Sequence, residues 1–413
     1  MIPRRVFVSL RQTALPLGLA SLILLASMGA PVLPAASKAS VSDYVQYWAA
    51  SRLVLSGENP YDWHRMLAME QQVQPSLRTP ILMWNPPWTL ALCMLPSLLP
   101  YPWSFGLWFS VCSLILIVAS RSLWDYWGGP PTDRALAVAL GWAFAPSCFA
   151  LAMGQVSPIM LLGIVGFLFF ERQRRFTAAG AFAALTLVKP HVVYLWWIGV
   201  VLWSIHERRW RVLAGALLAV GAASAVSMLP NQDVFLQYLH LLSEHPPDYW
   251  VTPTIGSLLR LLLGWETVWP SVVPALVGVA WFLAYWSRNR DNWIWSNEVS
   301  LVLLISVLTS PYTWLFDQIV LLLPVLQLAS SHVRRRSPAT SRGIVAYVVA
   351  VGLAFVLWPW PVIVAESDAY RSSGLLRHVL STPNMFWQVI VAPLLLVGFY
   401  VGLRRPLGVA NKG

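Results

Sequence analysis

The chain has 413 residues, of which 57% are hydrophobic and only 11% are charged. An ordinary soluble domain carries about a quarter charged residues, so this composition excludes a soluble globular protein. Apolar runs recur from end to end, many of them near the ~20 residues that cross a hydrocarbon core. The composition therefore predicts a polytopic, all-α integral membrane protein.

The net charge of +11 does not indicate nucleic-acid binding, because the basic residues cluster in short connectors between apolar runs. Such clusters follow the positive-inside rule and predict which connectors are cytoplasmic. The clusters are Arg4, Arg5 and Arg11; Arg172, Arg174 and Arg175; Arg208, Arg209 and Arg211; Arg334, Arg335 and Arg336; and Arg404 and Arg405.

The apolar run from Ala14 to Leu33 has two interpretations. A basic start followed by "PVLPAASKAS" is compatible with a cleaved signal peptide. The run is also long enough to span a bilayer, and we interpret it as the first transmembrane helix. Residues 35–85 then form a first loop outside the membrane.

The segment 85–100, "NPPWTLALCMLPSLLP", is apolar but short and is bounded by prolines. It is either a half-inserted helix or a span paired with 102–120. Treating it as half-inserted gives about twelve transmembrane helices, with both termini and every arginine cluster on the cytoplasmic side. The later spans are expected near 134–152, 157–170, 175–188, 191–204, 211–229, 267–286, 298–309, 313–329, 343–361 and 385–403, with a second outer loop at 230–266.

No repeat or linker divides the chain, so 1–413 is expected to be one membrane-embedded unit. Its acidic residues lie mainly in the outer loops, and we therefore expect the catalytic or binding residues there.

The three cysteines lie in apolar runs without metal-ligand spacing, and the spacing of His240 and His245 is not that of a zinc motif. No metal and no cofactor is expected.

The stretch 41–62, "VSDYVQYWAASRLVLSGENPYD", is too polar to span a membrane. Ser42 and Asp43 suit a helix start, and Gly57 with the following Pro60 suits its end. Asp62 can then cap a second short helix, "WHRMLAMEQQ". Asp43 is either a simple cap of the first helix or a general base at the water–lipid boundary, where partial desolvation tunes its pKa.

Lys189 interrupts the apolar stretch "LTLVKPHVVYLWW", and ionisable residues inside spans are costly and usually functional. Pro190 breaks the helix there, so Lys189 and His191 are expected at a kink near the outer face. Two cationic donors beside an opened helix suit a phosphate, although a lysine can also extend its ammonium to the interface. Gln155, in "MGQVSP", is expected in another outward-facing turn, where it either binds a sugar hydroxyl or satisfies backbone groups.

Five motifs in order resemble glycosyltransferase family 87: "SDYVQYWAASRLVLSGENPYD", "WNPPWTLALCMLPSLLP", "LAMGQVSPIMLLG", "AAGAFAALTLVKP" and "LTSPYTWLFDQIVLLLP". The resemblance covers roughly residues 40–330. It implies an integral membrane enzyme of the GT-C fold, related to polyprenyl-phosphate-mannose-dependent mannosyltransferases and to arabinofuranosyltransferases.

The resemblance implies transfer of mannose or arabinofuranose from a polyprenyl phosphate to a lipid-linked or glycan hydroxyl, with inversion at the anomeric centre. Asp43 matches the position of the catalytic base. Lys189, with His191 or Arg52, would stabilise the leaving phosphate. The expected substrate-binding residues are Tyr47, Asn59, Tyr61, Asn85, Gln155, Trp314 and Asp317.

Two positions depart from the family pattern. Asn85 stands before the paired prolines, where an aromatic residue is usual, and Phe316 with Asp317 follows Trp314, where the mannosyltransferases often carry a histidine. Because that histidine is expected to face the donor, the sugar stays open. Asp317 then either replaces it in substrate binding or acts as a second carboxylate.

The expected location is the bacterial cytoplasmic membrane, in contact with its lipids, with the active site facing the periplasm. One alternative is a transporter or flippase of a lipid-linked saccharide, which predicts polar residues near mid-membrane and often an internal repeat. Another is a non-catalytic membrane scaffold, which would need neither the Lys-Pro kink nor an acid at the head of the first outer loop.

Overall fold

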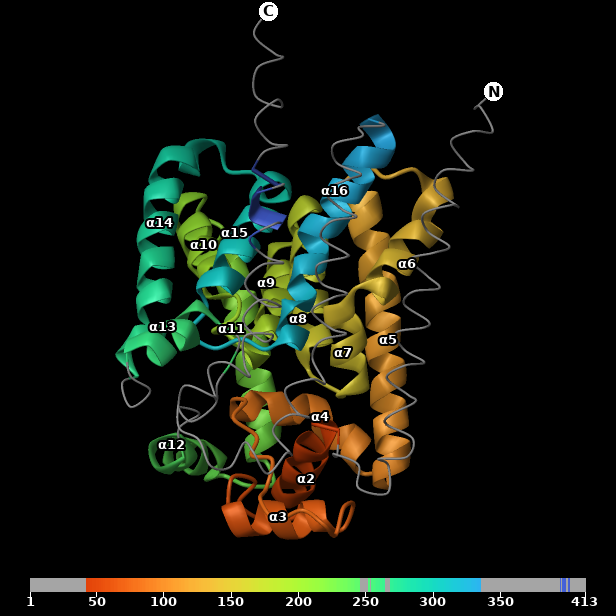
Figure 1. The fold of residues 1–413 in the computed structure, drawn as a ribbon, viewed down its shortest axis with the longest axis vertical. Coiled ribbons are helices and arrows are strands. Elements are labelled where there is room, and N and C mark those ends of the chain that lie inside the picture. Colours follow the sequence, from red (N-terminus) through yellow and green to blue (C-terminus); the bar gives the residue numbers. More distant parts are fainter. Residues whose placement is uncertain are drawn as a thin grey trace, which may run out of the picture.

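The computed structural model describes residues 42–245, 252, 254–263, 268–335, 394, 396–398, 400 and 401. All regular secondary structure in these ranges is helical, which confirms the predicted all-α class for this part of the chain (Figure 1). The predicted spans 14–33 and 343–361, and most of 385–403, lie outside the described residues.

The first outer loop forms two short helices, as predicted. Helix α2 (Tyr44–Leu55) ends before Gly57, whose φ of 73° is the left-handed conformation that terminates helices. Helix α3 (Trp63–Gln71) begins at Asp62, whose Oδ1 accepts a hydrogen bond from the Arg65 backbone N–H at 2.8 Å. The capping role predicted for Asp62 is confirmed.

The segment 85–100 does not cross the membrane on its own. It contains a 3₁₀ turn, η1 (Pro87–Thr89), and helix α4 (Leu90–Ser97), which has eight residues and so a length of about 12 Å. Helix α5 (Tyr101–Tyr126) follows with 26 residues, enough for a complete crossing. Of the two sequence interpretations, the structure therefore supports the short, non-spanning helix.

The middle of the chain is broken more often than its hydropathy suggests. The predicted span 134–152 is two helices that meet at a 62° bend, and Pro190 separates η3 from α10 as expected. The elements are η2 (Pro131–Asp133), α6 (Arg134–Ala143), α7 (Ala145–Ala152), α8 (Ser157–Arg172), α9 (Phe176–Ala184), η3 (Leu185–Val188) and α10 (Tyr194–His206).

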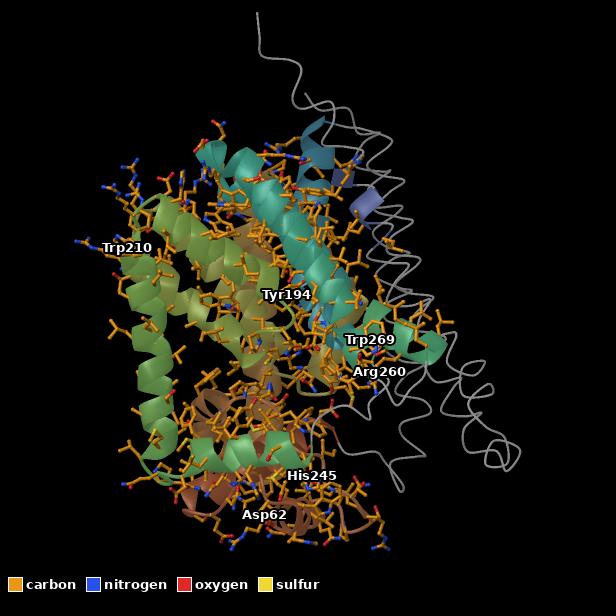
Figure 2. All side chains as sticks on the ribbon, turned by 90° about the vertical axis from the view of Figure 1, so that its left-hand side faces the viewer. Asp62, Tyr194, Trp210, His245, Arg260 and Trp269 are labelled. Atoms are coloured by element: carbon orange, nitrogen blue, oxygen red, sulfur yellow. The ribbon has the colours of Figure 1, made fainter. Side chains whose placement is uncertain are left out.

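Helix α12 lies across the end of α11, near the helices of the first outer loop (Figures 1 and 2). It packs there through Tyr238, whose ring lies 5.3 Å from that of Tyr61. The elements of this second half are α11 (Trp210–Met228), α12 (Val234–Glu244), α13 (Ile255–Leu263), η4 (Trp269–Ser271), α14 (Val273–Asn289), η5 (Arg290–Asn292), α15 (Trp295–Thr309), η6 (Leu315–Leu321) and α16 (Leu322–Arg335).

Four helical segments in the described ranges are long and apolar enough to cross a membrane, and the bent α6–α7 pair would make a fifth. The four are Tyr101–Tyr126, Trp210–Met228, Trp269–Asn292 and Leu315–Arg334. Three further apolar helices are shorter, namely Phe176–Val188, Tyr194–His206 and Trp295–Thr309. A multi-pass membrane protein follows, and the total of about twelve spans stays a prediction.

Arginine clusters lie at one end of the molecule and the two outer loops at the other. Trp210, beside one arginine cluster, lies at the opposite end from Asp62 and His245 of the two outer loops (Figure 2). Another cluster reaches the C-terminal end of α5, where Arg172 Nη1 donates to the Tyr126 carbonyl at 3.3 Å. This division agrees with the predicted sorting of basic connectors and outer loops.

Helices α9 and α11 approach each other so closely that only glycine fits at two contact points. A Cβ on Gly180 would overlap the carbonyl oxygen of Val212, and a Cβ on Gly215 would overlap that of Thr177. A Cβ on Gly221, further along α11, would meet no heavy atom within 4 Å. The two glycine contacts with α9 therefore lie in the first half of α11, and Gly221 takes no part in them.

This contrast yields a stability prediction. Gly215→Ala should destabilise the protein by about 1–3 kcal/mol, because the added methyl group forces the two backbones apart. Thermal unfolding of the purified protein in detergent measures the effect. Gly221→Ala on the same helix is the control and should leave the midpoint unchanged or raise it, since alanine favours helix by about 1 kcal/mol over glycine. Equal midpoints for the two variants would contradict the packing argument.

Candidate active site

The turn between α7 and α8 determines where Gln155 lies. The Gly154 N–H donates to the Leu151 carbonyl at 3.1 Å and the Gln155 N–H to the Ala150 carbonyl at 2.9 Å, the paired bonds of a Schellman motif. Gly154 has the positive φ, 64°, that this motif requires. The predicted turn is confirmed, and the Gln155 side chain is buried inside the protein, only 3% exposed.

The start of α2 packs directly on this turn. The Met153 carbonyl accepts hydrogen bonds from Ser42 Oγ at 2.7 Å and from the Tyr44 N–H at 3.1 Å. Ser42 Oγ, one residue before the N-cap position, also accepts from the Tyr44 N–H at 3.3 Å. The Asp43 side chain makes no capping hydrogen bond, and the interpretation of Asp43 as a simple helix cap is therefore wrong.

Lys189 occupies the break between η3 and α10, and neighbouring side chains hold the stretch of backbone before it. Asn85 Nδ2 donates to the Val188 carbonyl at 2.8 Å, and Trp88 Nε1 donates to the Leu187 carbonyl at 3.1 Å. These bonds replace the helical ones that the break leaves unmade. Asn85 thus fixes the backbone beside Lys189, which is itself 8% exposed.

Asp317 is completely buried at the start of η6. Its Oδ2 accepts from the Trp314 N–H at 3.0 Å, and its Oδ1 accepts from Ser157 Oγ at 2.7 Å. Lys189 Nζ donates to the same Oδ1 at 2.7 Å. A buried carboxylate is tolerated only when it is paired and hydrogen-bonded in this way.

Gln155 connects this ion pair to Asp43. Its Oε1 accepts from Lys189 Nζ at 2.9 Å and from the Tyr47 hydroxyl at 3.0 Å. Its Nε2 donates to Asp43 Oδ2 at 2.6 Å. Side chains from α2, the α7–α8 turn, the η3–α10 break and η6 therefore form one continuous polar cluster, which we call the Gln155 network: Asp43, Tyr47, Gln155, Ser157, Lys189 and Asp317.

The Gln155 network contains one cation and two carboxylates. Burial raises the pKa of Asp43, whereas the hydrogen bond from Gln155 and the charge of Lys189 oppose that rise. An ammonium has three N–H donors; Lys189 directs one to Gln155 and one to Asp317, and the third has no hydrogen-bond acceptor among the described residues. The Phe316 ring lies 4.4 Å from Nζ and provides a cation–π contact.

Other predicted site residues lie outside the Gln155 network. Arg52 donates from Nε to the Ser97 carbonyl at 3.0 Å, nine residues or about 13 Å along α2 from Asp43. Asn59 Oδ1 accepts from the Tyr61 N–H at 2.9 Å, which stabilises a turn. The Tyr61 hydroxyl donates to the Asn85 carbonyl at 3.4 Å. These contacts hold the three side chains within the protein, and their predicted binding roles stay predictions.

His191 and Trp314 lie beside the network and pack against Tyr312. The His191 ring lies 5.5 Å from the Tyr312 ring, and its Nε2 is buried without a hydrogen-bond partner among the described residues. Trp314 Nε1 donates to the Tyr312 hydroxyl at 2.8 Å. Sequence reasoning did not predict Ser157 and Phe316 as site residues, although both lie within motifs that carry predicted residues.

The described ranges contain no ligand set for a metal ion, because no three His, Cys, Asp or Glu side chains lie close together there.

A model of glycosyltransferase family 87 matches residues 83–311, more than half of the chain. The match includes Gln155 and Lys189 and excludes Asp43 and Asp317. Searches among curated proteins and among solved structures found no match.

The Lys189–Asp317 pair predicts non-additive effects on stability. Lys189→Met or Asp317→Asn alone should each cost about 3–5 kcal/mol, since either leaves a buried charge without its partner. The double variant should cost clearly less than the sum of the two. Unfolding of all four proteins in the same detergent tests this expectation, and strictly additive losses would contradict it.

Proposed function

The chain belongs to glycosyltransferase family 87, and from this membership, which implies a membrane glycosyltransferase, we propose a specific reaction. The enzyme moves a sugar from a polyprenyl-phosphate donor to a hydroxyl of a lipid-linked or glycan acceptor, with inversion at the anomeric carbon. Mannose and arabinofuranose are the proposed sugars. The observation that carries the proposal is the Gln155 network, in which a carboxylate and an ammonium flank one buried amide.

Asp43 is the proposed general base. Its Oδ2 is occupied by Gln155, and Oδ1 has no hydrogen-bond partner among the described residues, so it can accept the proton of an incoming hydroxyl. The raised pKa suits this role, because a base whose pKa approaches the working pH accepts a proton more readily. Asp43 lies before α2, which is not a membrane-crossing helix.

The proposed reaction balances in atoms and charge. The acceptor oxygen forms a bond to the anomeric carbon, the bond from that carbon to the phosphate oxygen breaks, and Asp43 takes the hydroxyl proton. Asp43 thereby loses one negative charge, and the departing polyprenyl phosphate gains one. The free N–H of Lys189 donates to this phosphate and stabilises the charge that develops there.

The substrates are proposed to reach this site from the side of the membrane that carries the first and second outer loops. The basic connectors at the opposite end support an outward-facing site, since such connectors stay in the cytoplasm (Figure 2). In a bacterium this side of the cytoplasmic membrane is the periplasmic one. The apolar lipid tail of the donor requires only the hydrocarbon phase and apolar helix surfaces.

A flippase for lipid-linked saccharides is the second candidate. The buried Lys189–Asp317 pair favours it, since ionisable residues inside a membrane protein also mark transport pathways. Family membership favours the transferase, and the two functions differ in a measurable product: a new glycosidic bond, or the same lipid on the other leaflet.

Transfer in proteoliposomes tests the proposal. A panel of polyprenyl-phosphate sugars is supplied with a lipid extract as acceptor. Asp43→Asn should lower turnover by about 10²–10⁴-fold, because the amide cannot accept the proton, while donor binding is retained. Asp62→Asn is the matched control; asparagine keeps the helix cap, so turnover should be unchanged.

Each alternative outcome identifies a different error. Full activity of Asp43→Asn would refute the general-base role and direct attention to Asp317. Movement of a lipid-linked sugar between leaflets, without transfer from any donor, would replace the transferase with the flippase. Loss of activity in both Asp43→Asn and Asp62→Asn would indicate that the loop, and not the carboxylate of Asp43, is required.

A further inference from the structure

The orientation of the Gln155 amide is determined by its neighbours. An ammonium can only donate, so the Gln155 atom beside Lys189 Nζ must be the carbonyl oxygen. The Tyr47 hydroxyl donates to that same oxygen. The NH₂ group therefore has to face Asp43, and a flipped amide would bring it against the ammonium.

Gln155 is also what holds the Asp43 side chain. The 2.6 Å bond from Nε2 is the only hydrogen bond to that carboxylate from within the described residues, because the Asp43 side chain makes no capping bond to the start of α2. The Schellman turn fixes the backbone of Gln155, and the Met153 carbonyl ties the start of α2 to the same turn. Backbone and side-chain contacts together set the direction of the free Oδ1.

We infer that Gln155 is a positioning residue for the transfer reaction, which aims Asp43 at the acceptor hydroxyl and links it to Lys189, and that it is not a ligand of the sugar. This inference rests on the proposed function. Three of the four hydrogen-bonding positions of the amide are already used inside the protein, and the side chain is 3% exposed. Only one hydrogen-bonding position of the amide remains for a sugar hydroxyl group, and the side chain exposes little surface to reach it.

The Gln155 amide also couples the charge of Lys189 to the proton affinity of Asp43. Lys189 polarises the carbonyl oxygen, which strengthens the N–H that stabilises the Asp43 carboxylate. When Lys189 turns its charge toward a leaving phosphate, that support weakens and Asp43 binds a proton more readily. Proton uptake and phosphate departure are thereby favoured together.

The test compares Gln155→Met with Gln46→Met, a second buried glutamine, on α2, with no side-chain hydrogen bond among the described residues. Gln155→Met should lower kcat by about 10–100-fold with little change in the donor KM, because a base displaced by about 1 Å loses this much. The acid limb of the kcat/KM profile should move up by about one pH unit, since the carboxylate loses its N–H donor. Gln46→Met should match the wild type.

Gln155→Glu is the second variant and keeps the acceptors for Lys189 and Tyr47. It should shift the acid limb further upward, because a second carboxylate beside Asp43 raises its pKa. A raised donor KM with unchanged kcat in Gln155→Met would overturn the inference and make Gln155 a substrate ligand. An unmoved acid limb would overturn it while leaving Asp43 as the base. Full activity of Asp43→Asn would instead overturn the proposed function.

Discussion

Three segments far apart in the sequence meet at one buried side-chain amide, and their arrangement depends on it. Gln155 accepts from Lys189 and Tyr47 and donates to Asp43. Each of these groups would be costly to bury without a partner. A change in any one of them leaves another polar atom unsatisfied, so the start of α2, the α7–α8 turn and the η3–α10 break are energetically coupled.

Backbone features hold each of these polar groups in position before any substrate binds. Gly154 allows the turn that presents Gln155, and Pro190 opens the helix at Lys189. Asn85 and Trp88 satisfy the carbonyls that the opening exposes. A site whose supporting bonds are already formed has little reorganisation to undergo when a substrate binds, which is how enzymes stabilise developing charge.

Local sequence patterns predicted a large part of this molecule. Apolar runs specified an all-helical membrane protein, Asp62 and Gly57 specified the borders of short helices, and Pro190 specified a break. Each of these features depends on neighbours within a few residues. The 62° bend between α6 and α7 was not predicted, because a continuous apolar run has the same hydropathy whether its helix is straight or broken.

Sequence by itself determined which residues were chemically unusual: a lysine in an apolar stretch, an acid at the head of the first loop, a glutamine after a glycine. Tertiary structure alone decided their roles. It buried Gln155 between Lys189 and Asp43, paired Lys189 with Asp317, added Ser157 and directed Arg52 to the carbonyl end of α4. The physical reason is that hydrogen-bond partners far apart in the sequence, by 45 residues for Arg52 and Ser97 and by 160 for Ser157 and Asp317, are chosen by the packing of helices. Spacing along the chain does not record that packing.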